Sequence, residues 1–300
     1  MKYLLLIFSI LCLISCQEEP RTINSLTPAS AKLIFELDCT KATPQLKTFL
    51  EEKSSKNKEW KLLKYFKLRV SNIDKLRFIL DQNESIHLIE TKHPYDLKKI
   101  YNYLNQKYIN RTEFTFNEVL FEDQILYQFS RKNRQISLYQ INPQLIIAGS
   151  DPAIFKCLKL NQETQLQKSD SLYQKLSQTP PNTIAQLISL GGITESSSWP
   201  ILKSISRIEA VLNIASSEKI SLTSTITLSK EENAQQLVSL SQSLLAFTSL
   251  PVSLKDSLKI SNESNYVKLE ASLNEEDLTQ INIAQQIKDQ KRATEKQSIP

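Results

Sequence analysis

Short stretches of alternating hydrophobic and polar residues recur along the chain, and segments with helical spacing separate them. Near the start, "KLIFELD" (32–38), "KLRFILD" (75–81) and "SIHLIET" (85–91) repeat with a period of two, which predicts β-strands. Apolar residues three and four positions apart predict helices over 43–53, 58–68 and 94–108.

Four more alternating stretches follow without an intervening helix, and short polar turns separate them, as in an antiparallel meander. They span 113–121, 124–131, 135–141 and 144–150. After helices predicted over 150–160 and 171–178, "TPP" (179–181) marks a boundary. The rest of the chain predicts strands over 183–190, 207–215, 219–228, 257–263 and 266–273, and helices at "SWPILKSI", over 229–250 and over 274–290.

A strand that leads through a capping residue into a helix recurs near 85–105, 144–160, 219–246 and 266–288. "TSTITLSKEENAQQL" and "KLEASLNEEDLTQIN" illustrate it, since each has an alternating strand, a cap, two acids and then helical spacing. Successive β-β-α units favour an α+β fold with antiparallel sheets and helices packed on one face. We therefore expect two β-β-α-repeat halves, an N-terminal one over 30–180 and a C-terminal one over 182–289, before a disordered tail over 290–300.

The N-terminus is an apolar run from Leu4 to Ile14 that follows one positive residue, Lys2. About twenty apolar residues are needed to cross a bilayer, so this shorter run is typical of a secretory signal. Its end, Leu13-Ile14-Ser15-Cys16, resembles the lipobox of bacterial lipoproteins. The resemblance implies a signal peptide over 1–15, cleavage before Cys16, and acylation of Cys16.

Two or more acyl chains on Cys16 hold a protein stably at a membrane. Residues 16–29 are then the lipidated cysteine and a polar, flexible tether. Gln17 stands where an Asp often retains lipoproteins in the inner membrane of Gram-negative bacteria, so it favours the outer membrane, facing the periplasm or the surface. The alternative is an ordinary signal peptide with a chance cysteine.

A second resemblance concerns the body of the chain. "TPASAKLIFELD", Thr27 to Asp38, and "IIAGSDPAIF" are similar to phrases in a group of uncharacterised exported proteins and lipoproteins of planctomycete, verrucomicrobial and lentisphaeral bacteria. The resemblance implies a style of fold built from β-β-α repeats. It implies no catalytic residue.

Composition excludes several classes of function. Three glycines are too few for the loops that cradle phosphates, so we expect no nucleotide site of the usual kinds and no cofactor. A net charge of +5 over 300 residues is mildly basic and, in an exported protein, does not predict nucleic-acid binding. Beyond the signal and Cys16, the remaining cysteines are Cys39 and Cys157, which form either a disulfide or, as we favour, two buried thiols.

Neither histidine predicts a metal site. His87 and Glu90 are three residues apart on a predicted strand, so their side chains point to opposite faces, and His93 is expected to cap the following helix. Ser-x-x-Lys spacings at Ser55 and Ser216 lack the companion motifs of penicillin-binding enzymes, so no catalytic residue is expected.

The basic stretch "KSSKNKEWKLLKYFKLR" (53–69) allows two interpretations. In the first, a lipid-anchored protein rests this segment on the bilayer surface. The contacts would be Trp60, Lys61, Lys64 and Lys67. In the second, which we favour, Trp60, Leu63 and Phe66 face the core while the lysines are solvated.

These observations favour a non-enzymatic, membrane-anchored lipoprotein that binds a protein partner or another ligand in the envelope, or has a structural role there. The first alternative is a carrier of a lipid or another apolar ligand, which needs a large apolar cavity. The second is a hydrolase without a recognised motif, which places buried acids of shifted pKa in a cleft. The favoured interpretation predicts no cluster of polar groups converging in a deep cleft.

Overall fold

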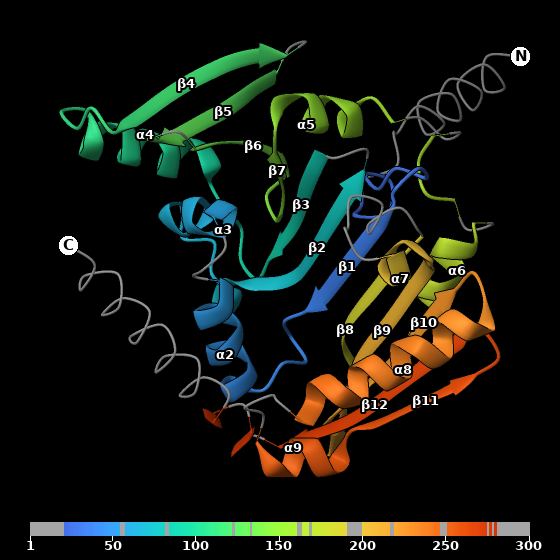
Figure 1. The fold of residues 1–300 in the computed structure, drawn as a ribbon. Coiled ribbons are helices and arrows are strands. Elements are labelled where there is room, and N and C mark those ends of the chain that lie inside the picture. Colours follow the sequence, from blue (N-terminus) through green and yellow to red (C-terminus); the bar gives the residue numbers. More distant parts are fainter. Residues whose placement is uncertain are drawn as a thin grey trace, which may run out of the picture.

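The computed structural model describes residues 21–54, 58–81, 84–121, 124–132, 134–160, 164–167, 170–190, 200–216, 219–246, 251–274, 276–277 and 279–280. Within them, the strands form one 12-stranded sheet in the order β11-β12-β10-β9-β8-β1-β2-β3-β7-β6-β5-β4. Every neighbouring pair is antiparallel. Figure 1 shows β1 beside β8 in the middle of this sheet.

The strands and most of the helices lie close to their predicted positions, but the short helix over 252–257 was not predicted. The strands are β1 (Leu33–Asp38), β2 (Ile73–Asp81), β3 (Glu84–Thr91), β4 (Phe114–Phe121), β5 (Gln124–Arg131), β6 (Arg134–Asn142), β7 (Leu145–Gly149), β8 (Thr183–Ser189), β9 (Ile205–Ser216), β10 (Lys219–Leu228), β11 (Lys259–Glu263) and β12 (Tyr266–Asn274). The helices are α2 (Pro44–Ser54), α3 (Lys58–Leu63), α4 (Leu97–Tyr108), α5 (Asp151–Leu158), α6 (Ser171–Ser177), α7 (Pro200–Lys203), α8 (Glu231–Ala246) and α9 (Val252–Ser257), with 3₁₀ turns η1 (Lys64–Phe66) and η2 (Val70–Asn72). The signal over 1–15, Cys16, the tail over 290–300 and most of the helix predicted over 274–290 lie outside the described residues.

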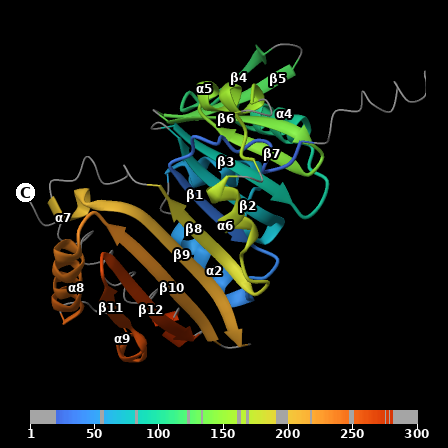
Figure 2. The same ribbon diagram turned by 90° about the vertical axis from the view of Figure 1, so that its right-hand side faces the viewer.

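The predicted assembly of these elements, two α+β halves with helices on one face, is wrong. The structure is mostly β, and one sheet runs through both predicted halves because β8 pairs with β1 from Leu33↔Ser189 to Leu37↔Ala185. Helices cover both faces, and Figure 2 shows α2 and α6 on opposite sides of the central strands. Alternation reveals a strand and its two faces, but it does not reveal the partner, which for β1 comes about 145 residues later.

The ends of the helices follow from local capping. Before α4, the side chain of Asp96 accepts a hydrogen bond from the backbone N–H of Lys99 at 2.9 Å, so Asp96 is the cap and the prediction for His93 is wrong. Before α5, Ser150 accepts from the N–H of Ala153 and a proline follows in the first turn, as the sequence predicts.

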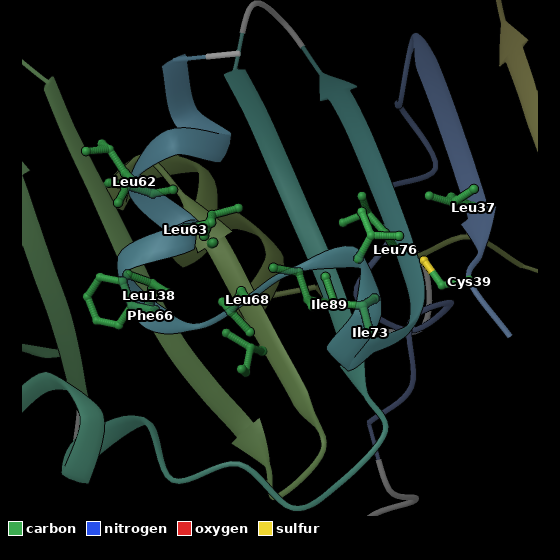
Figure 3. Close-up of a cluster of buried hydrophobic side chains, with 14 of the residues drawn as sticks. Leu37, Cys39, Leu62, Leu63, Phe66, Leu68, Ile73, Leu76, Ile89 and Leu138 are labelled. Carbon is green, nitrogen blue, oxygen red and sulfur yellow. The ribbon is translucent and has the colours of Figure 1, made fainter. Parts of the chain in front are cut away.

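Hydrophobic clusters lie on both faces of the sheet. Cross-strand register puts Leu37, Leu76 and Ile89 on what we call the first face (Figure 3), where they belong to one hydrophobic cluster with residues of α2, α3 and α4. At the C-terminal end of the sheet, α7 and α8 cover the same face. Ile34 and Leu88 point to the opposite, second face, against α5 and α6. The sheet is therefore the middle layer of a three-layer structure around its central strands.

Residues 21–29 belong to the folded body. Ile23 and Leu26 are buried in the second-face cluster, and Pro28 forms a β-bridge with Gln165. The backbone N–H of Ala29 also donates to the carbonyl of Thr164 at 3.0 Å. This part of the predicted flexible tether is thus packed on the sheet, whereas residues 16–20 lie outside the described residues.

Candidate functional site

The basic stretch over 53–69 contributes to the core as the favoured interpretation predicts. Leu63 and Phe66 are fully buried in the first-face cluster, and Figure 3 shows both on the segment that crosses in front of the sheet. The ring of Phe66 meets that of Phe129 edge to face at 5.3 Å between centroids. The segment is therefore fixed to the sheet by its apolar side.

The candidate membrane contacts on this stretch differ from one another. Lys61 and Lys67 are exposed to solvent. Lys64 is half-buried, donates to the backbone carbonyl of Glu51 at 3.1 Å and pairs with its carboxylate at 3.3 Å. The side chain of Trp60 lies outside the described residues. A contact of Lys61, Lys64 or Lys67 with a membrane stays a prediction.

His87 and Glu90 point to opposite faces of β3, as predicted. His87 is buried on the first face beside the ring of Phe78, with 5.2 Å between centroids. Glu90 lines a cleft on the second face. Among the described residues, no group of three or more His, Cys, Asp or Glu side chains is placed to hold a metal ion.

Cys39 and Cys157 are free, buried thiols, which confirms the favoured interpretation of the sequence. They belong to different clusters, Cys39 on the first face and Cys157 on the second, so the sheet separates them. Burial raises the pKa of each thiol to about 12. A protonated, enclosed thiol is a poor nucleophile, so neither cysteine is a candidate for catalysis.

A polar cleft opens on the second face, where α6 and the N-terminal segment meet β1, β2 and β3. Its volume is about 260 Å³, and it is lined by Thr22, Ile23, Asn24, Glu36, Lys75, Arg77, Glu90, Tyr173, Leu176 and Ser177. A second hollow of about 160 Å³ adjoins it and shares Glu36, Lys75, Leu176 and Ser177. The favoured interpretation of the sequence predicts no cluster of polar groups converging in a cleft, and this cleft contradicts that prediction.

Strand register explains why charged residues converge there. Glu36 of β1 lies opposite Arg77 of β2, and Lys75 of β2 lies opposite both Asp38 of β1 and Glu90 of β3. Residues directly opposite in antiparallel strands project from the same face. Three strands thus deliver a block of alternating charge to one side of the sheet.

Arg77 is the buried floor of the cleft, with a side chain only 4% exposed. Its Nε donates to Glu36 Oε2 at 2.8 Å, and its Nη2 donates to the same oxygen. Its Nη1 donates to Asn24 Oδ1 at 2.8 Å and to Thr27 Oγ1 at 2.9 Å. This arrangement satisfies the buried guanidinium and pins the N-terminal segment to the sheet.

Glu90 and Lys75 are the less constrained charges of the cleft. Lys75 Nζ is 3.5 Å from Glu36 Oε1, which is longer than a normal hydrogen bond. Within the described residues, the side chain of Glu90 forms neither a hydrogen bond nor an ion pair. Burial raises the pKa of Glu90 most, while attraction to Lys75 lowers it and repulsion from Glu36 raises it further.

The adjoining hollow has a paired acid on its wall. Asp38 Oδ1 accepts from the backbone N–H of Thr40 at 3.1 Å, and Asp38 Oδ2 is 3.2 Å from Lys41 Nζ. Burial alone would raise the pKa of Asp38, but the contacts with Thr40 and Lys41 outweigh it and lower that pKa. On the same wall Thr179 Oγ1 donates to Gln186 Oε1 at 2.6 Å.

The chemistry of the cleft suits binding. Its described lining has hydroxyl groups, one amide, the paired Arg77 and Glu36, one loosely held ammonium and one carboxylate without a partner. Histidine and cysteine are absent from this described lining. A signal for the site was present in the sequence, because Arg77 stands between Leu76 and the apolar run 78–80, where an unpaired charge is costly.

No helix in the described part of the chain combines the length and the hydropathy needed to cross a bilayer. Neither a protein-family model nor a curated protein matches the sequence. Two solved structures are similar, crystal form IV of TP0453 with a TM-score of 0.50 and crystal form I of TP0453 with a TM-score of 0.49. Each is 12% identical and covers 89% of this chain, and the match spans 97% and 98% of the respective TP0453 chains. At this identity the likeness concerns the fold alone: over most of its length, the chain has a fold similar to that of TP0453 in crystal form IV.

Proposed function

We propose that the chain is a non-enzymatic bacterial lipoprotein, held at the envelope by acylated Cys16, that binds a small polar ligand in the second-face cleft. The lipobox-like Leu13-Ile14-Ser15-Cys16 supports the anchor, and Gln17 favours the outer membrane. The observation that carries the binding role is that Lys75 and Glu90 share the cleft without forming an ion pair.

An incompletely paired charge at a half-buried position costs stability, because the protein solvates it less well than water does. Structural ion pairs on sheets are expected to close, as Arg77 and Glu36 do in the same cleft. Lys75 and Glu90 lie directly opposite each other and stay apart. A ligand that contacts both groups would give Glu90 a partner and would give Lys75 a closer one than Glu36.

The binding role is tested by filling the cleft. Ser177 is an exposed residue of its wall, so Ser177→Trp should block the space without disturbing the core, and Ser177→Ala is the matched control. We expect nuclear magnetic resonance screening of small polar metabolites against the full chain in detergent to find ligands that bind the alanine variant and not the tryptophan variant. Ligands that bind both variants equally, or no ligand at all, would refute the role.

The anchor is tested separately. Cys16→Ser should move the protein from the membrane fraction to the soluble fraction and remove the mass of the acyl chains. Retention of the variant in the membrane would contradict anchoring through this residue.

A carrier of an apolar ligand is the second candidate function. Half-buried apolar side chains of the central strands share the first face, where register places them side by side. They are Phe35, Phe78, Leu187, Leu212 and Leu222. Mass spectrometry of an organic extract of protein purified from its own envelope tests this function: a stoichiometric apolar molecule supports it, and an empty extract counts against it.

A further inference from the structure

We propose that the second-face cleft binds a zwitterion, with the ligand's ammonium group on Glu90 and its anionic group, a carboxylate or a phosphate, on Lys75. This inference rests on the proposed function, since it takes the cleft to be a ligand site. It adds the chemical class of the ligand and the two side chains that would select it.

The buried floor of the cleft is not available to a ligand. Arg77 uses Nε and Nη2 on one oxygen of Glu36, and Nη1 on Asn24 and Thr27. Replacing any of these bonds with a bond to a ligand would leave a buried partner unsatisfied. Recognition of a ligand therefore depends on the side chains above this floor.

Lys75 and Glu90 provide one positive and one negative group above the floor. Their backbones lie directly opposite on β2 and β3, which places their Cβ atoms about 5 Å apart. Long flexible side chains at this separation can reach each other, yet the ammonium of Lys75 lies toward Glu36 at 3.5 Å instead. A molecule with opposite charges a few bonds apart would contact both groups at once.

The charge balance of the cleft favours a zwitterion over a simple ion. Its charged lining residues are two acids, Glu36 and Glu90, and two bases, Lys75 and Arg77, so their formal charges cancel. A lone cation would face Lys75 and a lone anion would face Glu90. The volume of about 260 Å³ fits a small molecule or the head group of a larger one.

Two sources can supply such a group: a free metabolite or the head group of a zwitterionic lipid. Thr22 lines the cleft and follows Cys16 by six residues, which an extended chain spans in about 20 Å. The anchor proposed above therefore keeps the cleft within reach of the membrane surface. The zwitterionic chemistry is the same for both sources, so the experiment must separate them.

The probe is phosphoethanolamine, titrated by calorimetry into the full chain in detergent. Ethanolamine and inorganic phosphate, which have one charged group each, are the ligand controls. Glu90→Gln and Lys75→Gln remove one charge each from the cleft. Glu118→Gln removes an exposed strand carboxylate far from it and is the matched protein control. Circular dichroism confirms that each variant is folded.

We expect phosphoethanolamine to bind at least tenfold more tightly than either control ligand, and each cleft variant to lose at least tenfold in affinity while Glu118→Gln keeps it. Equal binding of the zwitterion and the single ions, or unchanged binding by both cleft variants, would overturn the inference. If uncharged metabolites bind and Ser177→Trp abolishes their binding, the cleft is a site but its ligand is not a zwitterion. If nothing binds at the cleft, the proposed function fails as well.

The source is identified by mass spectrometry of lipids that co-purify from the native membrane. Phosphatidylethanolamine that accompanies the wild-type chain and is lost from Glu90→Gln would assign the site to a lipid head group. Binding of soluble phosphoethanolamine without such a lipid would assign it to a free zwitterion. A lipid retained equally by Glu90→Gln would belong to a site other than the cleft.

Discussion

Two contrasting layers of side chains project from opposite faces of β1, β2 and β3. On the first face, Leu37, Leu76 and Ile89 pack into one hydrophobic cluster (Figure 3). On the second face, one residue further or back along each strand, the side chains are charged and line the cleft. Neighbouring residues such as Ile89 and Glu90 thus experience opposite environments on one strand.

The two layers have different roles. The hydrophobic layer stabilises the fold, and the charged layer provides groups that a ligand can contact. Removing apolar side chains from water stabilises the first face by about 25 cal/mol per Å². The second-face charges stabilise only where every group has a partner, as around Arg77. Glu90, which has none within the described residues, is a cost that the first face offsets.

The largest expected effect is the protection of the two buried thiols from alkylation. Cys39 reports on the first-face cluster and Cys157 on the second. Each is enclosed and burial raises its pKa to about 12, so alkylation requires an opening that costs up to the global stability, about 5–15 kcal/mol. We expect neither thiol to react with iodoacetamide in the native protein and both to react in urea, as read by mass spectrometry. Fast labelling of one thiol in native buffer would show that its layer is open.

Breaking the paired part of the charged layer comes next. Arg77→Met leaves Glu36, Asn24 and Thr27 without their buried partner, so we expect a loss of about 3–5 kcal/mol in the free energy of unfolding. Urea denaturation measures it. Glu36→Gln combined with Arg77→Met should recover part of the loss, because the double variant leaves no unpaired buried charge. Equal stability of wild type and Arg77→Met would show that the pair contributes nothing.

Truncation in the hydrophobic layer should cost about 3 kcal/mol. Ile89 is fully buried in the first-face cluster, and Ile89→Ala removes its contacts and leaves a cavity. The same urea measurement on Glu90→Ala provides the comparison on the adjacent residue, for which we expect a change several times smaller. Similar losses at both positions would contradict the division between the layers.

The smallest expected effect on the free energy of unfolding is that of Glu90→Gln, and its size depends on pH. Burial raises the pKa of Glu90 above the 4.5 of an ordinary glutamate, so the folded state holds this proton more tightly than the unfolded chain does. Protonated Glu90 therefore contributes stability that is fully present below pH 4.5 and is lost as the pH rises through the raised pKa. We expect Glu90→Gln to be as stable as the wild type at pH 7 or more stable, by about 0.5 kcal/mol or less. The difference should vanish as the pH falls.

Asp38→Asn is the matched control because its sign is opposite. The contacts with Thr40 and Lys41 lower the pKa of Asp38 below 3.8, so its stabilisation is present above that pH and is lost as the pH falls through the lowered pKa. We expect Asp38→Asn to be less stable than the wild type at pH 7, by about 0.5 kcal/mol since the group is partly exposed to solvent. Thermal unfolding at several pH values measures both variants, and equal signs would contradict the contrast.

The extent of prediction from sequence also differs between the layers. Period-two alternation located β1, β2 and β3 within about two residues, because burial of Leu37, Leu76 and Ile89 imposes that period locally. Coverage of both faces was missed, although "SIHLIET" has apolar residues at successive positions, which is typical of a strand between two layers.

The charged site could not be assembled from sequence because it depends on pairing. Lys75 and Glu90 are 15 residues apart and on adjacent strands, so a register shift of one residue would have put them on opposite faces. Asn24 was assigned to a tether because its surroundings are polar, and only its bond to Arg77 places it on the sheet. Of the charged residues of the cleft, only Glu90 drew attention in the sequence, and there only to reject a metal site, because tertiary pairing decides which residues meet.

The position of β1 between β2 and β8 also governs how the newly made chain can fold. One edge of β1 can pair with β2 soon after synthesis, but the other stays unpaired until β8 is made, about 145 residues later. At 5–20 residues per second, translation of that interval takes on the order of 10 s. Throughout it, the open edge of β1 is a template for pairing with other nascent chains. In a chain that stops before Thr183, that edge would stay unpaired. Such truncated products should therefore aggregate, even though they contain β1 to β7.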